Sequence, residues 1–456
     1  MSASRPALVR GVGLLGAVAV NVITMIGIGP LITIPLVLGA LHGPLSLIGW
    51  VLGAVLALCD GLVWAELGSA YPRSGGTYGY LLAIFGRVGI GPLPAFLFVW
   101  QTIFSAPLLL ASGYIGFANY AGYLFPALTG SPLALKALAV GVGVVTLIAL
   151  YRGIKTIERV SVLLGAIAVL TLLCVAGASF IHWSPQLAST MAPHDSFWAG
   201  LRAGLGSALI IAMYDYLGYS AANTIADEVV TPARTLPRAI GIAIALVAAL
   251  YITLQTGVLG AIPWQQFVPL ADGSLPPLGQ HLASAIVERV LGVPAAIGIT
   301  LLILITAFAS VYGNLLGASR IPYAAAQDGI FLRPFAHVHG HHRFPDVSLV
   351  VIGGIALVAC FFTLDQVINA LTAGIVLVQS VAQIVALFVM RARGVRAPYR
   401  MWMFPLPALI ALVGWIYIFC SAGAWPIIFG LLSLILGACV YFVGAVRWWP
   451  PLENGE

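Results

Sequence analysis

Apolar runs long enough to cross a lipid bilayer recur from one end of this chain to the other. A helix needs about 20 mostly apolar residues to span the hydrocarbon core. Within lipid the backbone must satisfy its own hydrogen bonds, so such runs become helices. Only 7% of the 456 residues are charged, whereas a soluble domain carries about 25%, and so few charges could not cover a soluble fold of this length. The sequence therefore predicts an all-α polytopic membrane protein.

The apolar runs predict twelve transmembrane helices in a single membrane domain that covers residues 1–456. The runs lie at 12–40, 44–70, 91–118, 132–151, 158–180, 199–228, 238–262, 292–320, 346–363, 366–390, 404–422 and 425–446. No small-residue cleavage site follows a short apolar segment near the start, so we expect no removable signal peptide.

The basic residues predict the orientation of these helices. If the N-terminus is cytoplasmic, only Lys136, Arg202 and Arg289 fall on the outer side, and the other Lys and Arg residues fall on the inner side. The positive-inside rule predicts this asymmetry for a correct helix count. We therefore expect a multi-pass protein of the cell inner membrane with both termini in the cytoplasm. The net charge of +6 then reflects membrane topology, and we expect no nucleic-acid partner.

Neither the cysteines nor the histidines predict a metal site. The cysteines lie in apolar runs without regular spacing, which argues for small membrane-core residues; they are Cys59, Cys174, Cys360, Cys420 and Cys439. Four histidines cluster in one polar loop beside Arg343, where a solvated surface is the simpler interpretation; they are His337, His339, His341 and His342. We expect no metal and no cofactor.

Two helices carry signals of a break at mid-membrane. The first run contains Gly27-Ile28-Gly29-Pro30, and the sixth contains Tyr214 to Tyr219 with Gly218 in its middle. Gly eases unwinding, and Pro removes a backbone donor. Matched interruptions in two halves of a chain point to a transporter binding site. The alternative is that these glycines only allow close helix packing.

The position of the two breaks favours a repeated architecture. Five helices lie from one break to the other, which predicts a five-plus-five arrangement with broken helices 1 and 6 and two extra helices. The first repeat would cover 12–200 with helices 1–5, the second 199–390 with helices 6–10, and helices 11–12 would lie at 404–446.

Four segments together resemble the amino acid–polyamine–organocation superfamily of permeases across nearly the whole chain. They are IGIG at 26–29, ELGSAYPRSGGTY at 66–78, ADEVVTPARTLPRAI at 226–240, and ASRIPYAAAQDG at 318–329 with Pro345 downstream. The resemblance implies an inverted five-plus-five repeat of the LeuT-like fold. It also implies alternating access and a substrate at the bilayer centre between helices 1, 3, 6, 8 and 10.

The resemblance also implies a substrate site made largely of backbone. A substrate carboxylate would bind amides at Ile28 and Gly29 beside Gly27, and an amino group would bind carbonyls of Met25, Tyr214 and Leu217 beside Gly218, with Tyr214 as an aromatic gate. The dipole at the start of a half-helix favours an anion, which agrees with this assignment. Further candidates for the cavity lining are Gln101, Asn369, Thr372 and Gln379.

Two features depart from the family pattern. Many relatives have a small polar residue where this chain has Ile28, and Pro30 removes one amide from the new half-helix. Asp215 adds an acid near mid-membrane, where an ionisable side chain normally has a partner or a role. It could be a counter-ion for a cationic substrate, a proton-coupling carboxylate, or a structural cap of the broken helix. These features favour amino acids with a cationic end, or polyamines.

Several residues are candidates for coupling to protons or sodium. Asp60 could make a structural hydrogen bond or relay protons, and Ser310 and Asn314 could line a sodium or water site or simply tie helices together. Glu66 is expected to pair with a loop arginine. The lysine that some proton-coupled relatives carry in helix 5 is absent, since 160–180 holds no Lys, Arg, His, Asp or Glu.

These observations favour a secondary active transporter of amino acids or related organic cations, with a small molecule and the lipid bilayer as its partners. The alternatives are a polyamine carrier, a nutrient sensor built on a transporter fold, or a channel. A channel would show a polar pore or charged rings. No HExxH or GxSxG motif supports an enzyme, and no GxxxxGK[ST] loop supports an ATP-driven pump.

Overall fold

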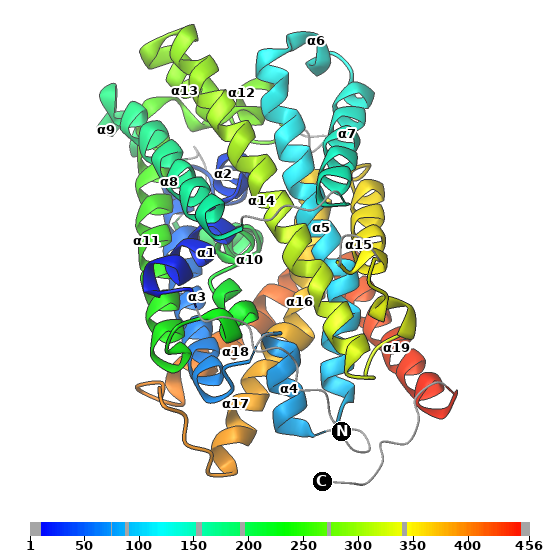
Figure 1. Ribbon diagram of the computed structural model, residues 1–456. Coiled ribbons are helices and arrows are strands. Elements are labelled where there is room, and N and C mark those ends of the chain that lie inside the picture. The colour runs from blue at the N-terminus through cyan, green and yellow to red at the C-terminus, as the bar shows by residue number, and fades with distance from the viewer. Residues whose placement is uncertain are drawn as a thin grey trace.

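A computed structural model describes residues 11–73, 75–86, 91–151, 157–191, 197–270, 275–339 and 344–447. Within these ranges the chain folds into a bundle of helices (Figure 1), and the only β-pairing is an isolated bridge between Val12 and Val229. The prediction of an all-α polytopic membrane protein is confirmed.

Every apolar run of the sequence coincides with a helix or with a group of consecutive helices. In chain order these are α1 (Leu14–Ile26) with α2 (Gly29–Leu41), α3 (Ser46–Ala70), α5 (Leu93–Leu124), α7 (Pro132–Tyr151), α8 (Ile157–Ile181), α10 (Phe197–Tyr216) with η2 (Ala221–Glu228), α11 (Pro232–Ala261), α14 (Val293–Gln327), α15 (Asp346–Ala359), α16 (Leu364–Ile375) with η5 (Val376–Ala382) and α17 (Gln383–Ala392), α18 (Leu406–Ser421) and α19 (Ala424–Arg447).

Within the described ranges, nine helices are long and apolar enough to cross a membrane, or ten if the bent pair α1 and α2 forms one span. The helices α15 and α18 are apolar but shorter, so the count of twelve stays a prediction. The sequence did not indicate the helices α4 (Thr77–Phe85) and α13 (Leu282–Leu291), which lie between the apolar runs.

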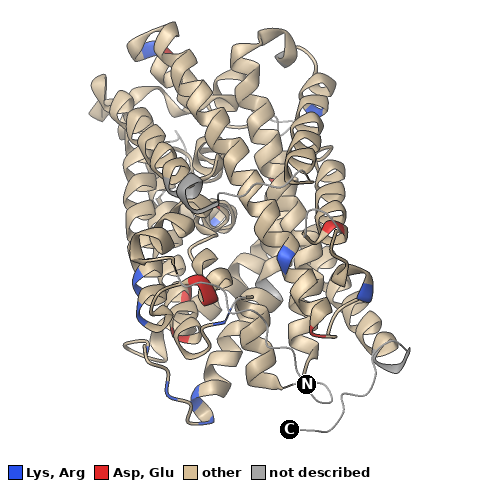
Figure 2. Cartoon of the chain, viewed as in Figure 1, with Lys and Arg blue, Asp and Glu red and all other residues tan. Residues whose placement is uncertain are grey.

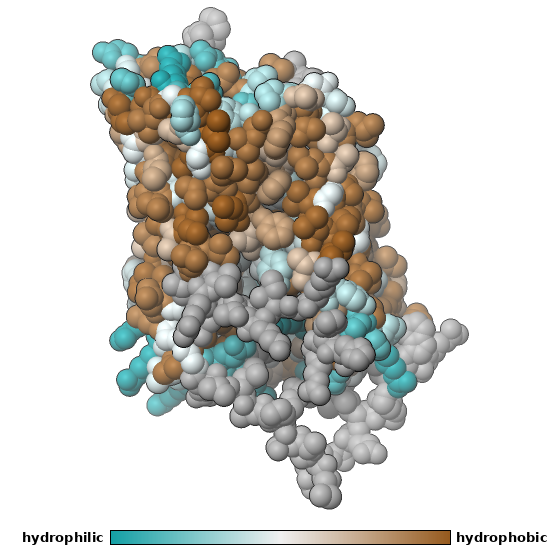
Figure 3. All heavy atoms as spheres, turned by 45° about the horizontal axis from the view of Figure 1, so that its top comes forward, coloured by the Kyte–Doolittle hydropathy of each residue, from teal (hydrophilic) through white to brown (hydrophobic). Residues whose placement is uncertain are grey.

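The surface of the bundle matches a lipid environment. Hydrophobic side chains cover the middle of the face in Figure 3, and hydrophilic ones gather at its two ends. Most of the Lys and Arg in Figure 2 lie toward the end of the bundle where α17 ends. Several residues used above for orientation or for the histidine loop lie outside the described ranges: Arg5, Arg10, Arg87, Arg152, Lys155, His341, His342 and Arg343.

Small residues let the central helices approach one another closely, as is usual in membranes. A methyl group at Gly53 of α3 would lie 2.9 Å from the Cβ of Ala212 in α10, and one at Gly61 would lie 2.6 Å from Ile244 in α11. This close contact fixes α3 against the helix that breaks at mid-membrane.

A proline inside α2 leaves a backbone acceptor that a neighbouring helix satisfies. Pro35 lacks the N–H that would normally bond the carbonyl of Leu31. The hydroxyl of Tyr120, buried in α5, donates to that carbonyl at 3.0 Å and accepts from the amide of Ala283 at 3.2 Å. The side chain therefore replaces a missing hydrogen bond inside the membrane.

The predicted partner of Glu66 is confirmed as an arginine. Arg391, in the last turn of α17, donates from Nε at 2.8 Å and from Nη2 at 2.6 Å to the two carboxylate oxygens of Glu66 at the end of α3. The amide of Met401 donates to the same carboxylate at 2.8 Å, and Arg391 also covers the ring of Phe404. A buried bidentate pair with these additional contacts ties α3 to α17.

We predict that Arg391→Met destabilises the folded protein by about 3 kcal/mol or more, because it leaves the buried Glu66 carboxylate without its cation. The check is thermal unfolding of the purified protein in detergent, with Arg396→Met as the control, since Arg396 is exposed. Equal midpoints for the two variants would show that the ion pair adds nothing to stability.

Candidate functional site

The two broken helices meet at their breaks. The axes of α1 and α2 differ by 47°, and α10 ends at Tyr216 before the short helix η2 begins. Gly218 adopts a φ of +111°, and a methyl group there would lie 2.9 Å from the carbonyl carbon of Thr24 and 3.0 Å from the amide nitrogen of Met25. Only glycine combines this φ with this approach, so Gly218 brings the backbone of one break against the other.

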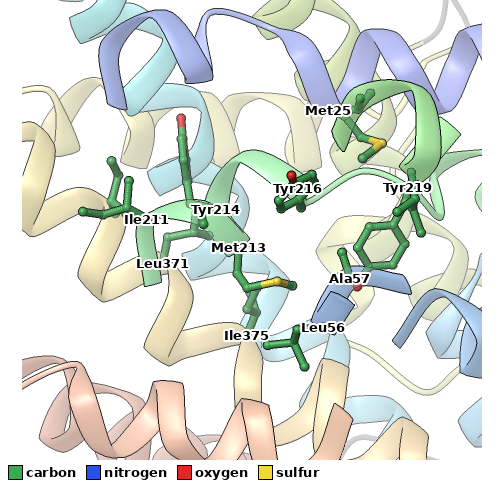
Figure 4. Close-up of a cluster of buried hydrophobic side chains, with 14 of the residues drawn as sticks. Met25, Leu56, Ala57, Ile211, Met213, Tyr214, Tyr216, Tyr219, Leu371 and Ile375 are labelled. Atoms are coloured by element: carbon green, nitrogen blue, oxygen red, sulfur yellow. The ribbon is translucent and has the colours of Figure 1, made fainter. Parts of the chain in front are cut away.

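Figure 4 shows the end of α10, where Tyr214 and Met213 extend in opposite directions. The hydroxyl of Tyr214 lies 2.7 Å from the Oγ of Ser112 in α5. This hydrogen bond holds the ring between α10 and α5, next to Gly29 at the start of α2.

The hydroxyl of Tyr251, in the unbroken helix α11, lies 2.9 Å from the carbonyl oxygen of Met25 and 3.2 Å from that of Asp215. These carbonyls belong to the last turns of α1 and α10, which have lost their helical partners. One donor from a rigid helix therefore serves both breaks. No local sequence signal pointed to Tyr251.

A second contact joins the broken helices on the side of α1. The side-chain oxygen of Asn21 accepts a hydrogen bond from the amide of Ala222 at 2.8 Å. Asn21 is fully buried, and the contact links the middle of α1 to the start of η2. This residue was also absent from the sequence-based candidates.

A cavity of about 850 Å³ lies against both breaks and is walled by α1, α5, α10, η2 and α14. Most of the predicted site residues line it, namely Met25, Gly27, Ile28, Gly29, Tyr214, Asp215, Leu217, Gly218, Ser310, Asn314 and Gln379. The structure thus brings together residues that are as far apart in the chain as Met25 and Gln379.

Other candidates lie elsewhere. Gln101 is buried beside a separate small cavity that it shares with Ser105 and Ser433, and neither atom of its amide group has a hydrogen-bond partner. Thr372 is fully buried, while Asn369 donates to the carbonyl of Asp365 near the start of α16. None of these three lines the large cavity.

Two coupling candidates lie at the break of helix 1. A methyl group at Gly27 would lie 2.9 Å from the Oγ of Ser310. Asn314 donates to the carbonyl of Ser310 at 3.0 Å and is 3.3 Å from its hydroxyl. Small oxygen-bearing groups of α14 therefore face the end of α1.

Asp60 lies in α3, outside the cavity lining. Its Oδ2 accepts hydrogen bonds from the indole of Trp64 at 3.2 Å and from the hydroxyl of Tyr219 at 2.5 Å. Because Tyr219 follows the break of helix 6, Asp60 anchors that break to α3.

Among the described residues, the cavity lining extends toward one end of the bundle. It is lined by several residues of α1 and by the second half of α14 as far as Arg320 and Ile321, but by only Gly29 from α2. At the other end the chain is packed tightly: a methyl group at Gly39 would lie 2.5 Å from Pro269, and the indole of Trp264 donates to the carbonyl of Thr190 at 2.9 Å. The site is therefore reached from the side on which α14 ends.

The fold and the cavity define a multi-pass membrane transporter. A family model described as amino acid permease matches residues 12–445, and the chain belongs to this family. It is 26% identical to a branched-chain amino acid permease of Bacillus subtilis, over 92% of this chain and 91% of that protein. It is also 26% identical to a mouse b(0,+)-type amino acid transporter, over 95% and 88%, and 25% identical to a methylthioribose transporter of Bacillus subtilis, over 88% and 86%.

We predict that Gly218→Ala destabilises the fold by about 1–3 kcal/mol, because alanine is strained at this φ and its methyl group would meet the backbone of helix 1. Thermal unfolding in detergent measures the effect. Gly298→Ala is the matched control, since a methyl group there has no neighbour within 4 Å. Similar unfolding midpoints for the two variants would contradict the close packing of the breaks.

Proposed function

We propose that this chain is a secondary active transporter that carries amino acids or related organic cations by alternating access, with the substrate bound between the breaks of helices 1 and 6. The observation that carries the proposal is that both helices break beside one cavity, with their backbone ends at its wall. Irregular backbone at membrane depth is tolerated where it lines such a cavity.

The polarity of the four half-helix ends supports an organic substrate with a positive group. The ends of α1 and α10 present carbonyls, including those of Met25 and Tyr214 and that of Leu217 just beyond α10. The dipole makes these ends negative. The start of α2 presents the amides of Ile28 and Gly29 and is positive. The names of the relatives above, most of which refer to amino acids, are consistent with this substrate class.

The observed conformation suits one state of an alternating-access cycle. We propose that the protein lies in the cell inner membrane with both termini in the cytoplasm. In that orientation the cavity opens toward the cytoplasm. The backbone just before α1 is bonded to the end of η2, because Val12 donates to the carbonyl of Glu228 at 3.0 Å and Val230 donates back to Val12 at 2.9 Å. This link would make the inner halves of helices 1 and 6 move together.

Coupling to an ion would use groups near the same breaks. Ser310 and Asn314 face the end of α1 and supply oxygen atoms of the kind that sodium prefers, while Asp60 and Asp215 are buried acids that could carry a proton. A channel or a sensor with this fold would not need to couple ion movement to substrate movement. Transport measurements separate these alternatives.

The proposal predicts saturable uptake into proteoliposomes that is stimulated by unlabelled substrate inside the vesicles. A panel of labelled amino acids and amines would be tested, with protein-free vesicles as the blank. Gly29→Ala should abolish uptake, because its methyl group would lie 2.2 Å from the carboxylate of Asp215. Gly141→Ala should transport normally, since nothing lies within 4 Å of the methyl group there.

Two outcomes would overturn the proposal. Uptake that neither saturates nor responds to internal substrate would indicate a channel. A folded protein that is stabilised by a ligand but carries none of the panel would indicate a sensor.

A further inference from the structure

The carboxylate of Asp215 reaches from the last turn of α10 to the first turns of α2. The residue is 1% exposed. Its Oδ2 accepts a hydrogen bond from the hydroxyl of Thr33 in α2, and Oδ1 lies so close to Gly29 that a methyl group there would be 2.2 Å from it. Oδ1 has no hydrogen-bond partner, and Asp215 lines the cavity.

This carboxylate lies at the positive pole of the site. The start of α2 is the helix end that favours an anion, and it is where a substrate carboxylate would find free amides. Pro30 already withholds one of those amides. The protein has therefore placed a carboxylate of its own beside the position that a zwitterionic substrate would need for its acid group.

A second carboxylate in this place would be opposed by Asp215. Two like charges about 4 Å apart at an effective dielectric constant of about 20 weaken binding about a thousandfold. An ammonium or guanidinium group would instead be attracted by the same amount, and it would donate to the unpartnered Oδ1.

The rest of the described cavity lining holds no cation near enough to neutralise Asp215. Arg320 is the one other charged residue among the described lining residues. It lies ten residues beyond Ser310 in α14, about 15 Å along the helix, whereas Ser310 is beside the break itself. Within the described lining, a positive charge beside the ionised Asp215 would therefore have to come with the ligand.

We infer that Asp215 takes the place of the substrate's carboxylate, so that this site selects organic amine cations without a carboxylate over the corresponding amino acids. The inference rests on the proposed function and narrows its substrate class. Thr33 is the positioning residue, because its hydroxyl holds the carboxylate against α2. The family does not restrict the chemistry to amino acids, as the methylthioribose transporter among the relatives shows by its name.

The test compares pairs of compounds that differ only by the α-carboxylate, agmatine with arginine and cadaverine with lysine. Dissociation constants would be measured by ligand-induced thermal stabilisation of the full-length protein in detergent, and uptake would be measured in proteoliposomes. We expect each amine to bind at least about tenfold more tightly than its amino acid, and to be carried in preference to it.

Variants then assign the preference to Asp215. Asp215→Asn should weaken amine binding at least about tenfold and leave amino acid binding unchanged or stronger. Thr33→Val keeps Asp215 but removes the hydrogen bond that holds its carboxylate. This variant should reduce the ratio of amine affinity to amino acid affinity. Asp365→Asn is the matched control, since Asp365 is exposed and outside the cavity lining, and it should keep the preference of the original protein.

The outcomes separate this inference from the proposed function. Arginine and lysine binding as tightly as their amines in the unaltered protein would overturn the inference, yet leave an amino acid transporter standing. If Asp215→Asn weakens the binding of an amine and of its amino acid equally, the inference would also be overturned, because Asp215 would then have a structural role. Failure of the folded protein to bind or carry any of the four compounds or other members of the panel would overturn the proposed function itself.

Discussion

The structure depends on one constraint: inside a membrane each backbone N–H and C=O needs a partner from the protein. Two helices break at mid-membrane, and each break frees groups that an intact helix would pair. Unbroken neighbours supply the partners, as Tyr251 does for the carbonyls of Met25 and Asp215. Tyr120 meets the same need at Leu31, where Pro35 interrupts the ladder. The irregular backbone that forms the cavity wall is thus stable because hydroxyl groups on rigid helices complete it.

Hydrogen bonds from side-chain hydroxyls are easier to exchange than the backbone hydrogen bonds within a helix. A carbonyl oxygen has two lone pairs, so the carbonyl of Met25 keeps one acceptor position while it accepts from Tyr251. The breaks also touch at Gly218, where the backbone of helix 6 approaches that of Thr24 and Met25. Shared acceptors and a glycine contact are compatible with the alternating access that we propose.

The sequence predicted the helices and their breaks well, and the facing of side chains poorly. Long apolar runs and the Gly and Pro interruptions are local signals, and every run became a helix or a group of helices. Gln101 was placed in the substrate site, but it lines a different cavity, because a helix that is apolar all round carries no pattern to fix its rotation. The role of Tyr251 could not be predicted for a related reason. Its partner Met25 is 226 residues away, and a tyrosine among aliphatic residues carries no local signal of a hydrogen-bond partner. The sequence indicated Asp215 as an acid within an apolar run. That its side chain points toward α2 could be known only from the packing of α10.

The charge balance of the cavity bears on the role that we infer for Asp215. Backbone dipoles alone would hold a zwitterion, because they offer one positive and one negative pole. A buried acid costs about 2.5–3.5 kcal/mol on insertion scales, and one hydrogen bond from Thr33 leaves most of its acceptor sites unfilled. On our inference, the ionised Asp215 leaves the empty site with an excess of negative charge, and a cationic ligand would offset it. The inferred discrimination would follow from the same excess of negative charge, since a ligand with its own carboxylate would add an anion beside Asp215.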